Sequence, residues 1–533
     1  MNSSPAGKLV APSSRRTQPG VRHRSGPIRF LGHWIILILV IALSIGLLPW
    51  LQLLKARTAG LRQSYVFFPV YTRDHGLDFE GEAMSGSSPY SMSVNVTTRR
   101  LLKHDYSSRK AEKIPPWDPH INTWQVRRHL SEESLLFVRM NVADVTYFLD
   151  LDFGSQLIWI NCKWSPKDKR GTWSKFVEKF KPGSPLHGPN GLYVPKHHET
   201  WCDTRLCAQL NSDEDGSSSC KDNLCYFSIS YGKEENIEGI VVRDDAVLSH
   251  SCVPSNDRNY RRFNLIFGCV YKRRSKATGK RIKYKEKLGS DGVLGLNQLP
   301  LSFPSQLFQE NVAERTVVLC LAKTKGVVAG YIVFGFPVKQ LGDGVQWVPL
   351  ERGEGGTYQV LLRNIKYGDD VVILGELLKG KLEIIIDGSV RFTYLADAIF
   401  KAFLKIVKRW AQAHGLEFQD IDGQGGACWS FGKATVGDGE LRERFKNLKF
   451  LFGSAATRRE MVVVPENFLF NPAIGLVCLG IRSSDDIEQP GINILGGMTM
   501  KERMILMDKT TDRFGWVDDE KCEQNRLAKL RPT

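Results

Sequence analysis

Residues 147–162 read YFLDLDFGSQLIWINC, a run of large apolar side chains interrupted by two aspartates and a Gly-Ser turn. Apolar runs that are rich in aromatic and β-branched residues are typical of buried β-strands. A carboxylate is costly to bury in such a strand unless it is paired or hydrogen-bonded. The stretch therefore indicates that its charge is used. Only Asp152 abuts the Gly-Ser turn, so Asp150, on the same face of the strand, is expected to be its neighbour.

A second stretch repeats this scheme. Residues 382–395 read LEIIIDGSVRFTYL, so that another apolar strand ends in an aspartate, Asp387, before a Gly-Ser turn. Each copy is followed later by an apolar segment that contains glycine, DGVLGL (291–296) and NILGG (493–497). The repeat predicts two diverged lobes, each of which brings one aspartate to a shared cleft.

Two carboxylates held within hydrogen-bond distance cannot both ionise cheaply, so one of them keeps a proton. The ionised partner can take a proton from a bound water, while the protonated partner donates to the carbonyl oxygen of a substrate. This chemistry needs no metal, no other cofactor and no covalent nucleophile. The aspartates that the two lobes would bring together are Asp152 and Asp387.

The composition favours an all-β chain of two lobes. The chain has 533 residues, which is too long for one ordinary hydrophobic core. Its 48 glycines and 24 prolines lie among short apolar runs. One helix is predicted over residues 395–415, where apolar residues recur at helical spacing before Gly415. The net charge of +16 is concentrated in the first 33 residues and in a basic segment, 271–287. That segment has no known nucleic-acid-binding module around it, which favours a solvated loop over a nucleic-acid partner.

Residues 34–54 are apolar enough to span a bilayer as a signal-anchor helix. Because the basic residues 1–33 precede this span, they are expected in the cytosol, and the chain is expected to be a type II membrane protein of the secretory pathway. Cleavage of the span as a signal peptide remains the alternative. Residues 55–128 are expected to form a stalk or a pro-like linker, with a glycosylation sequon at Asn95.

All eleven cysteines follow the predicted span, as expected of a chain that is oxidised in the secretory pathway. The pairs Cys202/Cys207 and Cys220/Cys225 are alternatives for metal binding. Their spacing is one residue wider than the common Cys-x-x-Cys hook, and no histidine pair follows at finger spacing, so disulfides are favoured and no metal site is predicted.

The ordered set of motifs resembles the pepsin-like (A1-type) aspartic protease family, and in particular its plant nucellin-like and nepenthesin-like branch. The resemblance covers roughly residues 130–525. Beyond the two aspartate stretches it rests on CYFSISYGKEENIEGIVVRDD (225–245), NLIFGC (264–269), DGVLGL (291–296), FPSQL (303–307), VCLG (477–480), NILGG (493–497) and FGWVDDEKC (514–522).

The resemblance implies a bilobal β fold with a central cleft, an N-terminal lobe at 129–345, a C-terminal lobe at 346–525 and a tail at 526–533. It implies a monomer that acts on a peptide or protein substrate. It implies a flap with Tyr231 and Gly232, and the disulfides Cys428–Cys478 and Cys320–Cys522. It implies Asp152 and Asp387 as the catalytic pair. The residues expected to support this pair are Gly154, Ser155, Gly388 and Ser389.

Both aspartate turns depart from the family motif, in which a hydroxyl residue follows each aspartate and bonds across to the opposite loop. Here Phe153 and Gly388 stand at those positions, so both hydroxyls are missing. Ser155 is still able to bond Asp152, whereas Val390 has no hydroxyl to offer Asp387. Two functions therefore remain open: an aspartic endopeptidase, or a pepsin-fold protein that acts as a peptide-binding, inhibitory or receptor-like module.

Overall fold

A computed structural model describes most of the chain beyond residue 135 and one short segment before it. All described residues belong to one compact unit, Gln63–Thr533. The described residues are 66–71, 136–164, 189–195, 202, 204–210, 216–231, 235–249, 260–275, 290–323, 328–372, 382–420, 426–432, 436–473, 475–487, 489–518 and 522.

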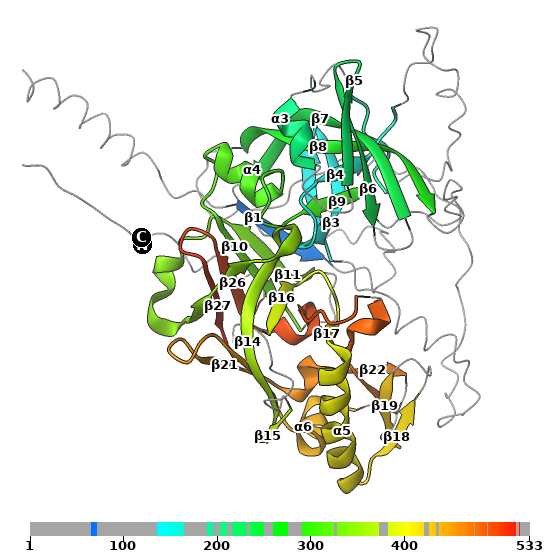
Figure 1. Cartoon of the computed structure of the whole chain (residues 1–533), viewed down its shortest axis with the longest axis vertical. Helices are drawn as coiled ribbons and strands as arrows, with labels where there is room; N and C mark the ends of the chain where they lie inside the picture. The colour runs from blue at the N-terminus through cyan, green and yellow to red at the C-terminus, as the bar shows by residue number, and fades with distance from the viewer. Residues whose placement is uncertain are drawn as a thin grey trace, which may run out of the picture. The chain divides into compact units, whose positions relative to one another are not determined.

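The described part is mostly β-strand and has the bilobal pepsin-like architecture that the sequence predicts (Figure 1). Up to residue 344 its elements are β1 (Val66–Tyr71), β2 (Phe137–Val142), β3 (Val145–Asp152), β4 (Trp159–Asn161), α3 (Thr204–Gln209), β5 (Gly216–Lys221), β6 (Leu224–Tyr231), β7 (Glu235–Ser249), β8 (Tyr260–Ser275), β9 (Gly292–Gly295), α4 (Phe303–Gln309), β10 (Thr316–Leu321), β11 (Val328–Phe334) and η3 (Val338–Gly344).

The remaining elements are again mainly strands. They are β12 (Gln346–Pro349), β13 (Glu351–Arg352), η4 (Glu354–Gly356), β14 (Tyr358–Tyr367), β15 (Asp370–Val371), β16 (Glu383–Asp387), β17 (Thr393–Leu395), α5 (Asp397–Ala413), β18 (Glu417–Asp420), β19 (Ala427–Ser430), α6 (Asp438–Arg444), β20 (Leu448–Phe452), β21 (Arg459–Val463), η6 (Pro465–Asn467), β22 (Leu469–Ala473), β23 (Leu476–Leu479), β24 (Ile481–Ser483), η7 (Ser484–Ile487), β25 (Ile494–Gly496), η8 (Gly497–Met500), β26 (Met504–Asp508) and β27 (Arg513–Val517).

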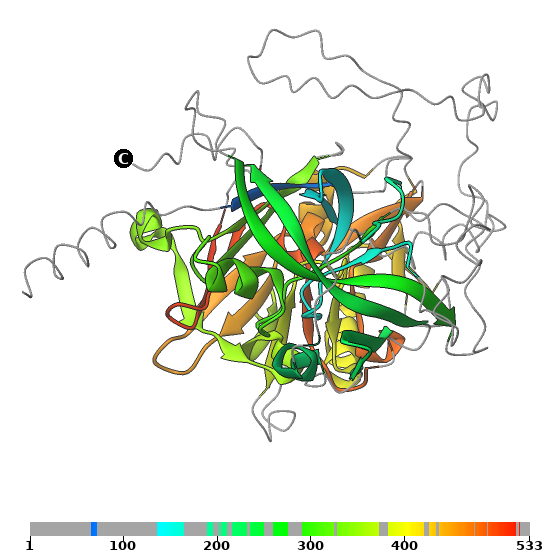
Figure 2. The ribbon, with the colours of Figure 1, turned by 90° about the horizontal axis from the view of Figure 1, so that it is seen from above.

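One large sheet joins strands from both halves of the chain. Its order is β12-β27-β26-β10-β11-β1-β2-β3-β9-β4-β8-β7-β6-β5, so that the last strands of the chain lie beside β10. The long antiparallel strands β7 and β8 run together over their whole length and twist across the molecule in Figure 2. A second sheet, β21-β20-β14-β16-β25-β17-β24, carries the other aspartate strand, and a third sheet contains β18, β19, β23 and β22.

The two aspartate strands have matching surroundings, which confirms the repeat that the sequence predicts. β3 pairs in parallel with β9, with Asp152 opposite Gly295, and β16 pairs in parallel with β25, with Asp387 opposite Gly496. In each copy a short strand that follows the aspartate turn, β4 or β17, pairs antiparallel with the same glycine-ended strand.

The glycines that end β9 and β25 allow the backbone to pass close to the aspartate turns. A Cβ on Gly295 would lie 2.7 Å from the backbone of Gln156, and a Cβ on Gly496 would lie 2.0 Å from the carbonyl oxygen of Phe392. Both contacts are shorter than real Cβ contacts, so only glycine fits. These glycines therefore fix where each aspartate turn sits against its lobe.

The predicted helix is present as α5, which lies beside β18 and β19 in Figure 1. It spans Asp397–Ala413 and buries Ile399, Phe400, Phe403, Val407 and Ala411 on one face. Gly415 adopts a φ of +72°, the left-handed conformation that glycine takes after the end of a helix. The structure thus confirms both the periodicity and the stop signal.

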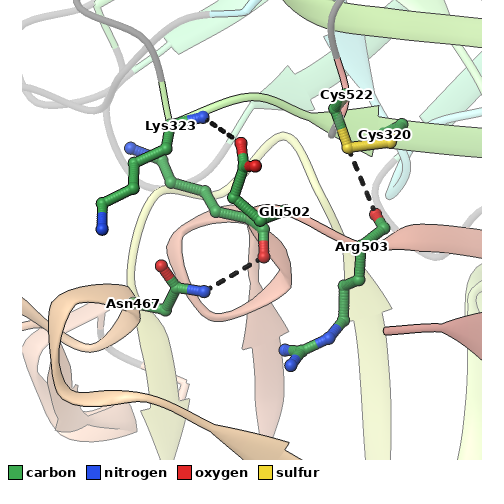
Figure 3. Close-up of a disulfide and its surroundings, with 7 residues drawn as sticks. Cys320, Lys323, Asn467, Glu502, Arg503 and Cys522 are labelled. Carbon is green, nitrogen blue, oxygen red and sulfur yellow. Dashed lines mark hydrogen bonds between the residues drawn. A yellow bond between two sulfur atoms is a disulfide. The ribbon is translucent and has the colours of Figure 1, made fainter. Parts of the chain in front are cut away.

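Five disulfides are formed in the described residues. Both implied pairs, Cys428–Cys478 and Cys320–Cys522, are confirmed. Figure 3 shows Cys522 bonded to Cys320 of β10 and beside the carbonyl of Arg503, which directly precedes β26. The expectation of disulfides over metal ligands is also correct, and the other bonds are Cys162–Cys269, Cys202–Cys220 and Cys207–Cys225.

Strand β1 places part of the segment 55–128, which was expected to be a stalk or a pro-like linker, within the large sheet. β1 lies between β11 and β2, and pairs with β11 from Val66 opposite Phe334 to Tyr71 opposite Val328. The physical reason is its sequence, VFFPVY, whose alternate residues Val66, Phe68 and Val70 are buried in the main core. This short apolar run was a strand signal within an otherwise polar segment.

Because Val70 is fully buried in that core, we expect Val70→Ala to lower the free energy of unfolding by about 2 kcal/mol. Val145→Ala, at a side chain that is 40% exposed, is the matched control and should change it by about 0.5 kcal/mol or less. Urea unfolding followed by fluorescence measures both. Equal effects at the two positions would contradict the assignment of β1 to the sheet.

The predicted membrane helix at 34–54, the tail 1–33 and the sequon at Asn95 lie outside the described residues. Among the residues that the structure describes, no helix is both long and apolar enough to cross a membrane.

Candidate active site

The first aspartate turn holds its carboxylate by backbone amides. In β3 the buried residues Tyr147, Leu149 and Leu151 alternate with half-buried residues, and Asp152 ends the strand on the half-buried face. Its Oδ1 accepts hydrogen bonds from the amides of Gly154 at 2.9 Å and Ser155 at 3.1 Å. Because both amides donate to the same oxygen, they fix the orientation of the carboxyl group. Among the described residues, no donor bonds Oδ2.

The second turn uses the same arrangement. Asp387 is 8% exposed, and its Oδ1 accepts the amides of Ser389 at 2.9 Å and Val390 at 3.3 Å. It also accepts the hydroxyl of Ser389 at 2.5 Å. In both lobes, the donors are thus the amides two and three residues after the aspartate.

The two carboxyl groups lie close enough to influence one another. Burial raises the pKa of Asp387 from its usual 3.8 to about 6; the Ser389 hydroxyl opposes this shift, and the negative charge of Asp152 adds to it. Removal from water also raises the pKa of Asp152, against the hydrogen bonds from Ser155 and Gly154. The pair therefore retains a proton at a pH where isolated aspartates are ionised, and that proton belongs to the pair.

In the family motif, the hydroxyl residue after each aspartate bonds to the opposite loop. In this chain, an apolar contact occupies that place. The ring of Phe153 is 1% exposed and packs edge-on against Tyr358, with ring centroids 6.3 Å apart. A Cβ built on Gly388 would lie 3.6 Å from Cε2 of Phe153 and 2.1 Å from Cδ2 of Leu319. Phe153 and Leu319 therefore occupy the space that a side chain at position 388 would need.

The second turn keeps a hydroxyl next to its aspartate, although Val390 has none to offer. The loss of the hydroxyl at Val390 does not leave Asp387 without one, because Ser389 supplies it one position earlier. Nor is Ser389 strained by a left-handed backbone, since it is absent from the non-glycine residues with positive φ. The amide of Ser389 also donates to the carboxylate of Asp387.

Asp150 shares the half-buried face of β3 with Asp152, but its Oδ2 accepts the hydroxyl of Ser290 at 2.7 Å. It is a structural neighbour of the pair, as expected. Tyr231 ends β6 opposite Glu235 of β7, which places it on a hairpin, as the flap requires. Its side chain and Gly232 lie outside the described residues, so their role in a flap stays a prediction.

The sequence did not identify Leu319 or Arg482 as residues of interest. Leu319 contacts the space above Gly388 from β10, a strand distant in sequence, and no local pattern indicates that contact. Arg482 lies in a three-residue strand, IRS, and is buried beside Phe392. The one available signal was an arginine directly after the apolar run VCLGI (477–481).

Comparisons with known proteins agree with this geometry. Residues 137–336 match the family described as xylanase inhibitor N-terminal, and residues 357–518 match its C-terminal counterpart. An aspartic proteinase of Oryza sativa subsp. indica is 27% identical over 392 residues, which cover 72% of this chain and 87% of that protein. The aspartic proteinase nepenthesin-2 of Nepenthes gracilis is 22% identical over 386 residues, covering 70% and 75%.

Among solved structures, the basic 7S globulin from soybean is similar, with a TM-score of 0.53 and 15% identity over 76% of this chain and 96% of that one. A likeness at this identity concerns the fold alone. The motifs, the paired aspartate turns and the two matched family regions lead to one conclusion: the chain belongs to the pepsin-like (A1-type) aspartic protease family and has homologues among plant aspartic proteinases.

Proposed function

We propose that this protein is an aspartic endopeptidase that hydrolyses peptide bonds at acidic pH with a water activated by Asp152 and Asp387. The observation that carries the proposal is the matched anchoring of the two carboxylates, each held through Oδ1 by the amides two and three residues later. Such anchoring leaves the other oxygen of each group available for chemistry. A chain that had lost catalysis would have no need to keep both anchors.

In the proposed mechanism the pair enters the reaction with one shared proton. The ionised carboxylate takes a proton from water as the water attacks the scissile carbonyl carbon, and the other carboxyl group donates its proton to the carbonyl oxygen. The tetrahedral intermediate then collapses, the C–N bond breaks, and the leaving nitrogen receives a proton from the pair. Neither Asp152 nor Asp387 forms a covalent bond to the substrate.

In the family motif, the hydroxyls after the aspartates hold the two turns together, and they are missing here. Another contact must therefore keep the two carboxyl groups at the distance that the reaction needs. Misplacement of a catalytic group by about 1 Å can cost on the order of a hundredfold in rate. Here the packing of Phe153 and Leu319 over Gly388 supplies a rigid contact at the same place. Close-packed interiors resist displacement, so this contact supports an active geometry.

The second candidate is a pepsin-fold protein that binds a protein or peptide without cutting it. It is favoured by the loss of both hydroxyls, at Phe153 and Gly388, and by the match to a family described as a xylanase inhibitor. The test is to incubate the purified protein with a peptide mixture and identify new termini by mass spectrometry. Internal cleavage supports the endopeptidase, whereas binding without cleavage supports the second candidate.

The raised pKa of Asp387 predicts the pH dependence of activity. Since the reaction needs one proton on the pair and the pKa of Asp387 is about 6, we expect cleavage to decline as the pH rises through about 6. Initial rates across the acidic and neutral range on one peptide measure this. A rate that keeps rising toward alkaline pH would contradict the assignment.

The same shift affects stability, with a definite sign. A carboxyl group whose pKa is higher in the folded state than its usual 3.8 stabilises the fold fully below pH 3.8, and this contribution is lost as the pH rises through about 6. Over that pH range, the melting temperature of the wild type should therefore fall more steeply than that of Asp387→Asn, which has no such proton to lose. Parallel pH dependences for the two proteins would contradict this assignment of the proton.

The proposal includes a location outside the cytosol, and the disulfides suit an oxidising compartment of the secretory pathway. Residues 34–54 are proposed as the anchor of a type II membrane protein, with a peptide or protein as substrate and the chain as a monomer. Resistance to carbonate extraction, together with protection of the folded domain from added protease in sealed microsomes, tests the anchor and its orientation. Release by carbonate would contradict it.

A further inference from the structure

Arg482 is a buried cation whose donors are incompletely satisfied. It lies on β24 opposite Tyr394 of β17, and the residue is 9% exposed. Its Nε and Nη2 are buried without a hydrogen-bond partner among the described residues. A guanidinium stays charged at any physiological pH, and burying it without an anion is costly. The arrangement points to an anion from outside the described chain.

The guanidinium lies over an aromatic ring that it shares with a second arginine. Cζ of Arg482 is 4.8 Å from the ring centroid of Phe392, and Cζ of Arg391 is 5.1 Å from the same centroid. Arg391 also lies 5.1 Å from the ring of Phe470. Contact with a ring face compensates part of the desolvation of an arginine, and it does not use the N–H donors that lie in the guanidinium plane.

This arginine pair is connected to the aspartate turn through a continuous apolar cluster. Val390, whose amide donates to Asp387, packs against the buried cluster of Phe392, Tyr394, Ile494 and Met498. Partly buried residues also pack against this cluster, so its edge reaches the surface; these are Ile385, Phe470, Ile487 and Ile492. The cluster thus joins the aspartate turn to the ring of Phe392, over which the two arginines lie.

We propose that Arg482, together with Arg391, binds an acidic side chain of the substrate, a few residues from the scissile bond. The inference rests on the proposed function, in that it takes a peptide to lie at Asp152 and Asp387. The methylene groups of a glutamate would pack on the Phe392 cluster, and its carboxylate would accept N–H groups from the guanidinium, the donor best suited to a planar two-oxygen acceptor. The substrates are thus peptides with an acidic residue at one defined position.

The experiment compares cleavage of a randomised peptide library that holds equal amounts of Glu and Gln at each position. At a pH of about 5.5 a free glutamate is mostly ionised. The wild type should prefer Glu over Gln at one position by about 10- to 100-fold in kcat/KM, the range of one hydrogen-bonded charge. Arg482→Gln should reduce this preference to about twofold or less, and Arg391→Gln should reduce it in part.

Arg139→Gln is the matched control, because Arg139 lies 5.2 Å from the ring centroid of Phe148 but is exposed on β2. It should keep the preference of the wild type. Circular dichroism checks that each variant folds, and if Arg482→Gln does not fold, the more exposed Arg391→Gln decides. A wild type that cleaves Glu and Gln peptides equally, or a variant that folds and keeps the full preference, would overturn the proposal.

Binding to Asp387→Asn separates this proposal from the proposed function. If no peptide is cleaved, but Glu peptides bind this protein more tightly than Gln peptides in an arginine-dependent way, the acidic subsite stands and the endopeptidase does not. If peptides are cleaved without regard to acidic residues, the endopeptidase stands and the subsite does not. Neither cleavage nor Glu-selective binding would overturn both.

Discussion

Asp387→Asn is expected to abolish peptide hydrolysis while it leaves the fold intact, and Asp152→Asn is expected to do the same. Each substitution removes a group that must exchange a proton, and general acid–base catalysis contributes roughly 10²- to 10⁴-fold per group. The fold should survive because the amide oxygen of asparagine can still accept the amides of Ser389 and Val390, as Oδ1 of Asp387 does. Rates on one peptide, with melting curves for each variant, measure both effects.

Asp150→Asn is the control for this prediction. Asp150 lies on the same strand and the same face as Asp152, but is bonded by Ser290 and takes no part in the proposed chemistry. Its variant should keep activity within about threefold of the wild type, well short of the loss of a general acid or base. If the two catalytic variants cleaved as well as Asp150→Asn, the residues responsible would lie elsewhere in the chain.

The largest stability effect is expected at Phe153. Truncation to threonine, which restores the hydroxyl of the family motif, should lower the free energy of unfolding by about 3 to 5 kcal/mol, because a fully buried ring is lost from the main core. Gly388→Ser should cost about 1 to 3 kcal/mol, since its Cβ would lie 2.1 Å from Leu319. The restored hydroxyls are not expected to compensate, since each contributes only about 1 kcal/mol.

The double variant tests whether the two positions are coupled. Without the ring of Phe153, Leu319 gains space into which it can move, so Gly388→Ser should cost less in the Phe153→Thr background, by about 1 kcal/mol. Phe308→Ala is the control for loss of a ring, because Phe308 is 43% exposed and should cost about 1 kcal/mol or less. Additive effects, or a Phe153→Thr variant as stable as Phe308→Ala, would refute the packing contact.

The sequence predicted those features whose signal lies within one short segment or occurs twice in the chain. The strands that end in Asp152 and Asp387 are recognisable because apolar runs and Gly-Ser turns recur in both halves. The glycines Gly295 and Gly496 that oppose them follow from the same repeat. Helix α5 was predictable because its apolar spacing and its glycine stop lie within one short segment.

What the sequence could not predict depends on contacts between distant segments. Leu319 reaches Gly388 from another part of the chain, so the sequence showed only that a hydroxyl was missing and not what fills the space. The hydroxyl of Ser389 replaces the one expected from position 390, because turn geometry and not motif order decides which atom reaches the carboxylate. Likewise, Arg482 becomes notable only once the fold buries it beside Phe392.

The most direct test of the aspartate pair is to incubate the whole oxidised chain, in detergent, with a peptide mixture at several pH values from acidic to mildly alkaline. New internal termini are then identified by mass spectrometry, with Asp387→Asn run in parallel. We predict cleavage at acidic pH that declines as the pH rises through about 6 and is absent from the variant. Intact peptides at every pH, with a wild type that is folded by circular dichroism, would contradict the proposal that this pair hydrolyses peptide bonds.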